Sequence, residues 1–177
     1  MLLSRHGVRA PTLPNVELDK QVATPFPAWP VAPGETGELW IAGPMVVPGY
    51  WGNPQATADA FTAGYWHSGD LGSVDAQGFV RVFDRKKDML NRGGFKIYSV
   101  EVENVIMGVA GVVEAAVVGV PCPVLGERVH AFIHGSGVQA HEVRAHCAAN
   151  LADYKVPETV TLVDSPLPRN ANGKLMK

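Results

Sequence analysis

The chain has 177 residues, of which 46% are hydrophobic and 18% are charged, with 15 basic and 17 acidic residues. This length can bury a core in one large domain or two small ones, and the slight acidic excess argues against a nucleic-acid-binding protein, which usually carries a basic surplus. No apolar run approaches the roughly 20 residues of a transmembrane helix, and Cys122 and Cys147 form no CxxC pair, so we expect a cytoplasmic protein without disulfides or a metal site.

The first half of the sequence predicts a β-rich region that contains one helix. Its N-terminal stretch is rich in proline, and short apolar pieces within it, such as Val16–Leu18, predict brief edge strands and turns. Glu38–Ala42 alternates polar and apolar residues, as a half-buried strand does. Asn53-Pro54 predicts an N-cap and a first helical residue for a helix over Gln55–Phe61, and Phe79–Phe83 predicts a further strand.

The second half predicts a small α+β domain. From Gly93 onward, the sequence predicts a helix, two strands, a helix and a strand, at 99–108, Val112–Val120, Val129–Ile133, Val138–Leu151 and Thr159–Val163. Ser99 is the predicted N-cap of the first of these helices. The β-branched and alanine run of Val112–Val120 predicts a buried strand. The change of pattern near Arg85 therefore divides the chain into two parts.

Five segments, in the same order along the chain, resemble motifs of the adenylate-forming superfamily. This family includes acyl-CoA synthetases, the adenylation domains of peptide synthetases, and luciferase. The segments are Gly37–Ile41 with Pro48–Trp51, Trp66–Gly72, Asp84–Asp88 with Gly93–Ile97, Glu101–Glu103, and Pro168–Lys174. Together they cover nearly the whole chain.

The resemblance implies an α+β fold in two parts. Residues 1–85 are expected to be the incomplete, β-rich C-terminal portion of the large AMP-binding domain, ending its β-barrel-like subdomain. Residues 86–177 are expected to form the small C-terminal lid domain. We expect Trp40, Trp51 and Trp66 in the barrel core. The family's Ser/Thr/Gly-rich phosphate loop is absent from the sequence, so the chain is expected to be a C-terminal fragment, and the missing N-terminal half is an expected partner in trans.

The implied parent activity is that of an ATP-dependent acid–thiol ligase. Such an enzyme activates a carboxylic acid as acyl-AMP and passes the acyl group to CoA, with Mg²⁺ bound mainly by the missing part. Asn91–Gly94 and Val117–Glu127 resemble fatty or aryl acyl-CoA synthetases most. Without the phosphate loop, the isolated chain is expected to be inactive.

Two alternatives remain open on the sequence alone. The chain could be the adenylation fragment of a peptide synthetase, although no carrier-protein domain follows Lys177. It could also be a truncated, non-catalytic module that keeps the fold without turnover.

The resemblance assigns nucleotide contacts to Asp70 and Arg85. A carboxylate only accepts hydrogen bonds, and its two oxygens can accept from both ribose hydroxyls. Arg85 matches a second ribose or phosphate contact. Without the resemblance, Asp70 is an ordinary turn residue and Arg85 an exposed strand end. Lys87 matches the hinge between the two parts, a role that needs no particular side chain, so the residues alone do not separate Lys87 from Lys86.

The lid motifs supply the remaining expected site residues. Gly93 and Gly94 match the loop that lines the pantetheine tunnel, although Gly-Gly also suits an ordinary hairpin turn. Lys174 matches the catalytic lysine, whose compact positive charge can bridge the substrate carboxylate and the α-phosphate. At the end of a chain, a solvated lysine is the simpler interpretation. We expect that interpretation to hold for Lys177, to which no role is given.

Overall fold

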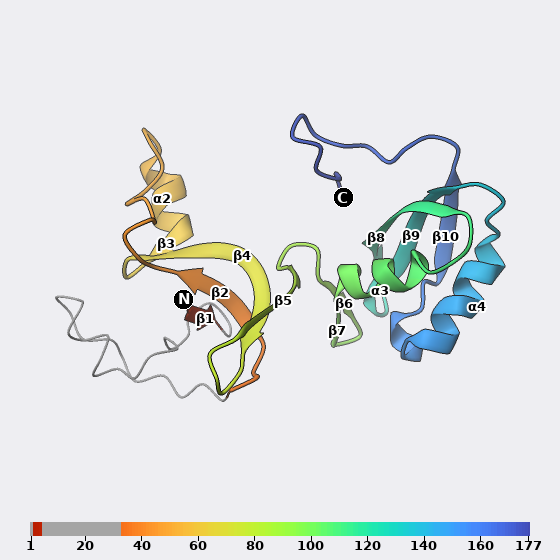
Figure 1. Cartoon of the computed structure of the whole chain (residues 1–177), viewed down its shortest axis with the longest axis horizontal. Coiled ribbons are helices and arrows are strands. Elements are labelled where there is room, and N and C mark those ends of the chain that lie inside the picture. Colours follow the sequence, from red (N-terminus) through yellow and green to blue (C-terminus); the bar gives the residue numbers. More distant parts are fainter. Residues whose placement is uncertain (1, 5–32) are drawn as a thin grey trace. The chain divides into compact units, whose positions relative to one another are not determined.

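The computed structural model describes residues 2–4 and 33–177, which form two compact units, Met1–Lys86 and Lys87–Lys177, each with its own sheet (Figure 1). The strand predicted within Val16–Leu18 lies outside the described residues.

The first unit contains an antiparallel sheet and one short helix. The sheet has the order β1-β2-β4-β3, and β5 pairs with β4, so the described strands form an open sheet and not a closed barrel. The elements are β1 (Leu2–Ser4), β2 (Gly37–Ile41), α2 (Pro54–Ala60), β3 (Phe61–Thr62), β4 (Tyr65–Val74) and β5 (Val80–Arg85).

Helix α2 begins where the sequence predicts. The side chain of Asn53 accepts a hydrogen bond from the backbone N–H of Ala56 at 3.0 Å, and Pro54 occupies the first turn. An N-cap oxygen satisfies a backbone donor that has no partner inside the helix, and proline at this position removes another. Two local signals were therefore sufficient to place this helix.

Strand β4 and the position of Trp51 differ from the expectations. The sequence around Ser68-Gly69-Asp70 indicates a turn, yet it lies within the ten-residue strand β4, where Gly69 adopts a φ of +74°. Trp40 is buried at 2% exposure, but Trp51 is fully exposed, so its placement in a core was wrong. Trp51 lies in a turn immediately before α2 and not on a strand.

The second unit is the predicted α+β domain. Its sheet has the order β10-β9-β6-β7, with β8 pairing along β9; β10 runs parallel to β9, and the other pairs are antiparallel. The elements are β6 (Leu90–Arg92), β7 (Phe95–Ile97), α3 (Ser99–Ile106), β8 (Val112–Cys122), β9 (Gly126–Gly135), α4 (Ala140–Asn150), a 3₁₀ turn (Asp153–Lys155) and β10 (Thr159–Val163).

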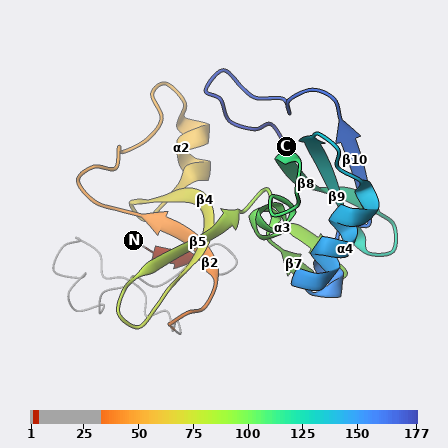
Figure 2. The ribbon, with the colours of Figure 1, turned by 45° about the vertical axis from the view of Figure 1, so that its right-hand side comes forward.

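Helices α3 and α4 cover one face of this sheet, as Figures 1 and 2 show. Successive strand side chains point to opposite faces, so alternate residues of β8 and β9 enter the core beneath the helices. The buried core comprises Leu90, Ile97, Val102, Ile106, Val117, Val129, Ala131, Ile133, Val138, Val143 and Cys147. This core positions β6, β7 and α3, which carry the lid motifs at Gly93–Ile97 and Glu101–Glu103, but it contains no residue of the segment Pro168–Lys174.

Two predictions for this unit need correction. Ser99 is not the N-cap of α3: Tyr98 occupies that position without a side-chain hydrogen bond, and Ser99 is a fully buried first helical residue. Strand β8 is only partly buried, since Ala116 and Val117 are inside while Val113 is 60% exposed. The helices cover only one face of the strand, and a β-branched run does not reveal this.

The core predicts that substitutions at a buried and at an exposed position of this sheet differ strongly in their effect on the free energy of unfolding. We expect Ile133→Ala, at 1% exposure, to lower the free energy of unfolding by about 2–5 kcal/mol, and Ile133→Val by about 0.5–1.5 kcal/mol. Val113→Thr, at an exposed position of the same sheet, is the control and should change it by about 0.5 kcal/mol or less. Urea denaturation followed by circular dichroism measures all three, and equal losses for Ile133→Ala and Val113→Thr would contradict the assigned core.

Candidate functional site

Asp70 and Arg85 lie opposite each other on neighbouring strands of the first unit. Asp70 of β4 is in register with Arg85 of β5, and Arg85 Nε lies 2.9 Å from Asp70 Oδ1. Their side chains are 31% and 44% exposed, so both remain accessible from solvent. Arg85 Nη1 also donates to the carbonyl of Ser68 at 3.4 Å. The register thus brings together the two residues that the sequence assigns to a nucleotide.

The carboxylate of Asp70 keeps capacity for a ligand beside this ion pair. A carboxylate has about four lone-pair directions, and Arg85 Nε uses one oxygen, Oδ1. The backbone N–H of Asp70 donates to Ser68 Oγ at 3.0 Å. This bond uses the Ser68 side chain and not the Asp70 carboxylate, so it does not support the interpretation of Asp70 as an ordinary turn residue. The pair can offer both acceptors and a positive charge to one polyhydroxylated anion.

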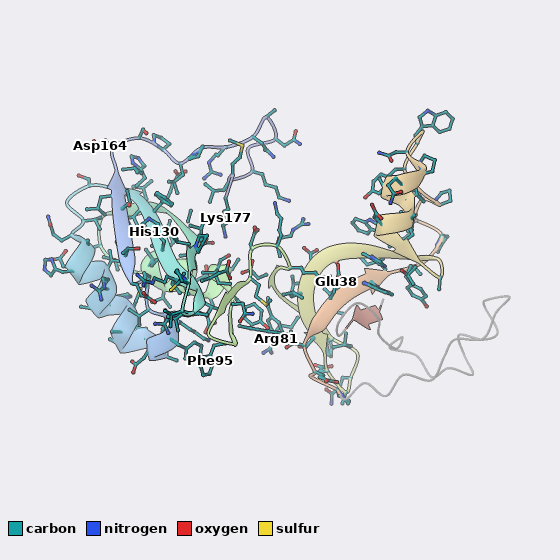
Figure 3. All side chains as sticks on the ribbon, turned by 180° about the vertical axis from the view of Figure 1, so that it is seen from behind. Glu38, Arg81, Phe95, His130, Asp164 and Lys177 are labelled. Atoms are coloured by element: carbon teal, nitrogen blue, oxygen red, sulfur yellow. The ribbon has the colours of Figure 1, made fainter. Side chains whose placement is uncertain are left out.

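The residues on either side of the unit boundary differ in how they are held. Lys86 Nζ contacts Glu38 Oε2 at 2.9 Å, and the Lys86 backbone N–H donates to the Gly69 carbonyl at 2.7 Å. Glu38, labelled in Figure 3, is buried at 6% exposure. The division into units falls between Lys86 and Lys87. Lys86, in the turn after β5, is therefore bonded to the first unit, whereas Lys87 is the first residue of the second unit.

Gly93 and Gly94 form the two-residue loop between β6 and β7. Arg92 pairs with Phe95 across the loop, and the two glycines have φ values of +58° and +90°. Both central residues of a type I′ hairpin turn need positive φ, which glycine adopts without steric cost. The ordinary hairpin interpretation thus describes the local backbone, and the pantetheine role remains a prediction.

This glycine loop is fastened to strand β9 and to the segment before β10. The Gly93 N–H donates to the Leu125 carbonyl at 2.7 Å, and the Asn91 N–H donates to Glu127 Oε2 at 2.6 Å. Arg92 Nε lies 2.7 Å from Glu158 Oε1. These contacts join the loop and strand β6 to the turn before β9, to β9 itself and to the segment before β10.

Cys122 closes the neighbouring turn between β8 and β9. Its pKa lies below the ordinary thiol value because the backbone N–H groups of Leu125 and Val124 point at the sulfur, with a smaller contribution from Arg128, whose Nε is 3.3 Å away. The side chain is only 6% exposed. The Cys122 sulfur thus accepts hydrogen bonds within the turn between β8 and β9.

Lys174 stands near the tip of a short hairpin after β10. Its backbone N–H donates to Asn170 Oδ1 at 2.9 Å, and its carbonyl accepts the Asn170 N–H at 2.8 Å. Gly173 precedes it with a φ of +76°, so the tight turn expected from the sequence is present. The Lys174 ammonium is exposed and makes no hydrogen bond or ion pair with any other described residue.

The structure shows that sequence reasoning misjudged Lys177. We expected a solvated side chain, but that side chain is only 14% exposed. Lys177 is labelled in Figure 3; its Nζ contacts Glu103 Oε1 at 2.6 Å and donates to Ser99 Oγ at 2.7 Å. The sequence carried one usable signal, the acidic Glu103 in the predicted helix 99–108, which a basic side chain could pair with. No spacing rule connects Glu103 with Lys177, because they are 74 residues apart.

The part of the chain that the structure describes shows neither a metal-binding cluster nor a membrane-spanning helix. Residues 2–4 and 33–177 contain no group of three or more His, Cys, Asp or Glu side chains placed to hold a metal ion. No helix in the same ranges has the length and apolar character to cross a bilayer.

The AMP-binding enzyme C-terminal domain matches residues 101–174. Feruloyl-CoA synthase from Amycolatopsis sp is 44% identical over 168 residues, which is 93% of this chain and 34% of the relative. Long-chain-fatty-acid–CoA ligase from Yersinia pestis is 42% identical over 146 residues, or 81% of this chain and 26% of the relative. The chain thus spans about a third or less of the curated relatives it matches.

A solved structure extends the likeness to both parts of the chain. O-succinylbenzoate coenzyme A synthetase from Bacillus subtilis, in complex with ATP and magnesium ion, has a TM-score of 0.79 and 32% identity, covering 98% of this chain and 32% of that chain. The similarity therefore covers nearly the whole chain, including the five segments that carry the resemblance. The chain therefore contains an AMP-binding enzyme C-terminal domain at residues 101–174, and over most of its length it is similar to the C-terminal part of CoA ligases and synthetases.

Proposed function

We propose that the chain is the C-terminal part of an ATP-dependent acid–thiol ligase of the acyl-CoA synthetase type. The parent enzyme activates a fatty or aryl carboxylic acid as acyl-AMP and transfers the acyl group to CoA. The observation that carries this proposal concerns Lys174. Its backbone is held in a hairpin by hydrogen bonds, while its ammonium makes no hydrogen bond or ion pair with another described residue. The names of the relatives support the CoA-ligase class.

Each site residue has a part in this proposal. Asp70 accepts hydrogen bonds from the ribose hydroxyls, and Arg85 contacts the ribose or a phosphate. Lys174 places positive charge between the substrate carboxylate and the α-phosphate, where negative charge builds up in the transition state. Gly93 and Gly94 allow the pantetheine arm of CoA to approach the backbone closely.

Lys87 is the proposed hinge between the large-domain portion, 1–85, and the lid, 86–177. The contrast with Lys86 supports this choice, since Lys86 is tied to Glu38 and Gly69. Rotation about the backbone of one residue at an element end is a common way to move a lid between two catalytic steps.

The proposal also covers the nucleotide, the metal ion and the cellular compartment of the protein. The exposed Asp70–Arg85 pair fits ATP or AMP chemically. A neighbour of similar structure is in complex with ATP and magnesium ion, and we assign Mg²⁺ to an N-terminal part of the kind that the longer relatives have, which is the proposed partner in trans. We place the protein in the cytoplasm, which the two free cysteines support.

A chimera tests the proposed function. In this hybrid enzyme, which we name the ferulate chimera, residues 1–177 replace the matched segment of the Amycolatopsis feruloyl-CoA synthase. We expect it to catalyse ferulate-dependent ATP–pyrophosphate exchange and to form feruloyl-CoA when CoA is added. The 177-residue chain by itself should catalyse no exchange, because the phosphate loop is absent from its sequence.

Two results would count against this proposal. A folded ferulate chimera without exchange would show that the chain does not serve as the C-terminal part of a ligase, as expected for a non-catalytic module. Exchange by the purified chain alone would show that it carries its own phosphate site. A chimera that forms feruloyl-AMP but transfers it to a carrier-protein thiol in preference to CoA would favour the peptide-synthetase alternative.

A further inference from the structure

The hairpin that carries Lys174 is well ordered within itself. Arg169 and Leu175 form an isolated antiparallel bridge at its base, and the Gly173 N–H donates to the Asn170 carbonyl at 2.9 Å near its tip. Asn170 also holds both backbone polar groups of Lys174, as described above. These bonds fix the shape of the hairpin but do not fix where it stands on the second unit.

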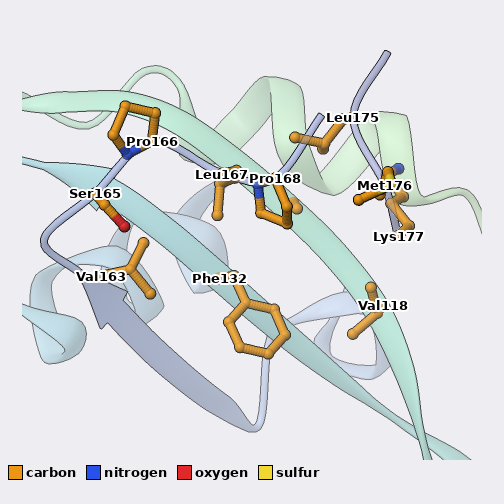
Figure 4. A pocket seen from close by; sticks show the side chains of 11 residues that line it. Val118, Phe132, Val163, Ser165, Pro166, Leu167, Pro168, Leu175, Met176 and Lys177 are labelled. Carbon is orange, nitrogen blue, oxygen red and sulfur yellow. The ribbon is translucent and has the colours of Figure 1, made fainter. Parts of the chain in front are cut away.

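Apolar packing beneath the hairpin is incomplete. A cavity of about 320 Å³ lies between the terminal segment and the sheet face opposite the helices (Figure 4). This pocket is open to solvent on one side, so the apolar side chains along it lack the close packing that a core supplies. The cavity is lined by Ala116, Val118, Phe132, Val163, Ser165, Pro166, Leu167, Pro168, Leu175, Met176 and Lys177. Polar anchors must therefore contribute much of the hairpin's placement.

Arg169 makes a direct connection between the sheet and the residue before Lys174. Its Nη2 lies 2.6 Å from Glu114 Oε1, on β8, and its Nη1 donates to the Gly173 carbonyl at 2.9 Å. That carbonyl belongs to the peptide bond whose nitrogen is Lys174. One guanidinium thus joins a strand of the sheet to the backbone of Lys174.

Glu114 is in turn held firmly. Its side chain is 18% exposed, and its second oxygen accepts the Leu167 N–H at 2.7 Å. The Arg169 hydrogen bond, followed by that of the Leu167 N–H, holds the pKa of this carboxyl below its ordinary value. The lowered pKa means that the paired carboxylate is stabilised above its ordinary titration range and that this contribution is lost as the pH falls through the folded-state value.

A second anchor secures the far leg of the same hairpin. Lys177 contacts Glu103 and Ser99 of α3, and Glu103 Oε1 also accepts the Val117 N–H of β8 at 2.7 Å. The two anchors therefore hold the legs on either side of Lys174, but only Arg169 also touches the peptide bond of Lys174.

We propose that Arg169 is a positioning residue that sets the place of Lys174, with Glu114 as its anchor on the sheet. The functional half of this inference rests on the proposed role of Lys174 in adenylation. A guanidinium offers several N–H donors in a rigid fork and can serve Glu114 and the Gly173 carbonyl at once, whereas a lysine ammonium is a compact point charge on a flexible stem. Arg169→Lys should therefore behave much like Arg169→Ala.

Hydrogen exchange of the 177-residue chain tests the positioning itself, independently of any activity. In Arg169→Ala, Arg169→Lys and Glu114→Gln, we expect the amide of Leu167, which donates to Glu114 on the sheet, and the amide of Lys174 to exchange about tenfold faster than in the unmodified chain. Glu142→Gln, which removes an exposed carboxylate from α4, is the matched control and should leave these amides unchanged. Unchanged exchange in Arg169→Ala would overturn the proposal.

Kinetics of the ferulate chimera separate positioning from a general structural role. We expect Arg169→Ala to lower kcat of ATP–pyrophosphate exchange about tenfold, with little change in KM for ATP or ferulate. A residue that acts only through Lys174 adds no loss once Lys174 is absent, so Arg169→Ala/Lys174→Ala should equal Lys174→Ala. A further loss in the double variant would overturn the proposal.

The outcomes also distinguish this inference from the proposed function. If the folded, unmodified chimera shows no exchange activity, the proposed function fails, while the hydrogen-exchange result still decides whether Arg169 places the hairpin. If the chimera is active and Arg169→Ala leaves kcat unchanged, the positioning role fails and the proposed function stands.

Discussion

In the ferulate chimera, Lys174→Ala is expected to slow ferulate adenylation by about 100- to 1000-fold, the range seen when one pre-placed donor to a developing negative charge is removed. The reason is that the ammonium acts mainly on charge that appears in the transition state, so kcat should fall more than KM rises. Pre-steady-state formation of feruloyl-AMP measures this step directly.

Two controls make the Lys174 result specific. Asn172→Ala changes an exposed neighbour in the same hairpin and should leave the adenylation rate unchanged. Transfer of the acyl group from preformed feruloyl-AMP to CoA should also be unaffected by Lys174→Ala, because the proposed contact belongs to the first step. An unchanged adenylation rate in Lys174→Ala would remove the role given to this residue.

Asp70→Ala is expected to weaken ATP binding by about 10- to 100-fold in the same chimera, the loss that corresponds to a hydrogen-bonded charged group. The affected contacts are those to the ribose hydroxyls, so the loss should depend on those hydroxyls. Unmodified chimera should bind ATP more tightly than 2′-deoxy-ATP, and Asp70→Ala should bind both nucleotides equally. Fluorescence titration with each nucleotide measures this difference.

The ion pair with Arg85 requires its own control. Asp70→Ala also breaks this pair, but pairs at such exposure contribute at most about 1 kcal/mol to stability, so the variant should remain folded. Asp59→Asn, an exposed carboxylate on α2, should leave nucleotide affinity unchanged. If Asp70→Ala still prefers ATP over 2′-deoxy-ATP as strongly as the unmodified chimera does, Asp70 is not the ribose ligand.

Much of the fold followed from local patterns. The Asn53-Pro54 start of α2, the period of α3 and α4, and the β-branched strands from Val112 to Val163 were all predicted, because each depends on neighbours within a few residues. Strand β4 was missed since its Gly69 indicates a turn, and only pairing with β2 and β5 makes that segment extended.

The candidate site likewise combines residues that the sequence pointed to and contacts that only the structure shows. Asp70, Arg85 and Lys174 were assigned from their motifs, and these roles stay predictions; the register of β4 and β5 places Arg85 Nε 2.9 Å from Asp70 Oδ1. The contacts of Glu114, Arg169 and Lys177 were not predictable. Their contacts join positions 55 and 74 residues apart, which no sequence period relates.

The sequence by itself determined the family, the residue types available for chemistry and the local turns that glycine and asparagine create, because these depend on composition and on short-range backbone preferences. The tertiary structure alone decided which charges meet: Asp70 with Arg85, Glu114 with Arg169, and Glu103 with Lys177. Such pairs form only when packed sheets and helices bring distant segments within a few ångströms, and Coulomb attraction between them falls with distance in space and not with separation along the chain.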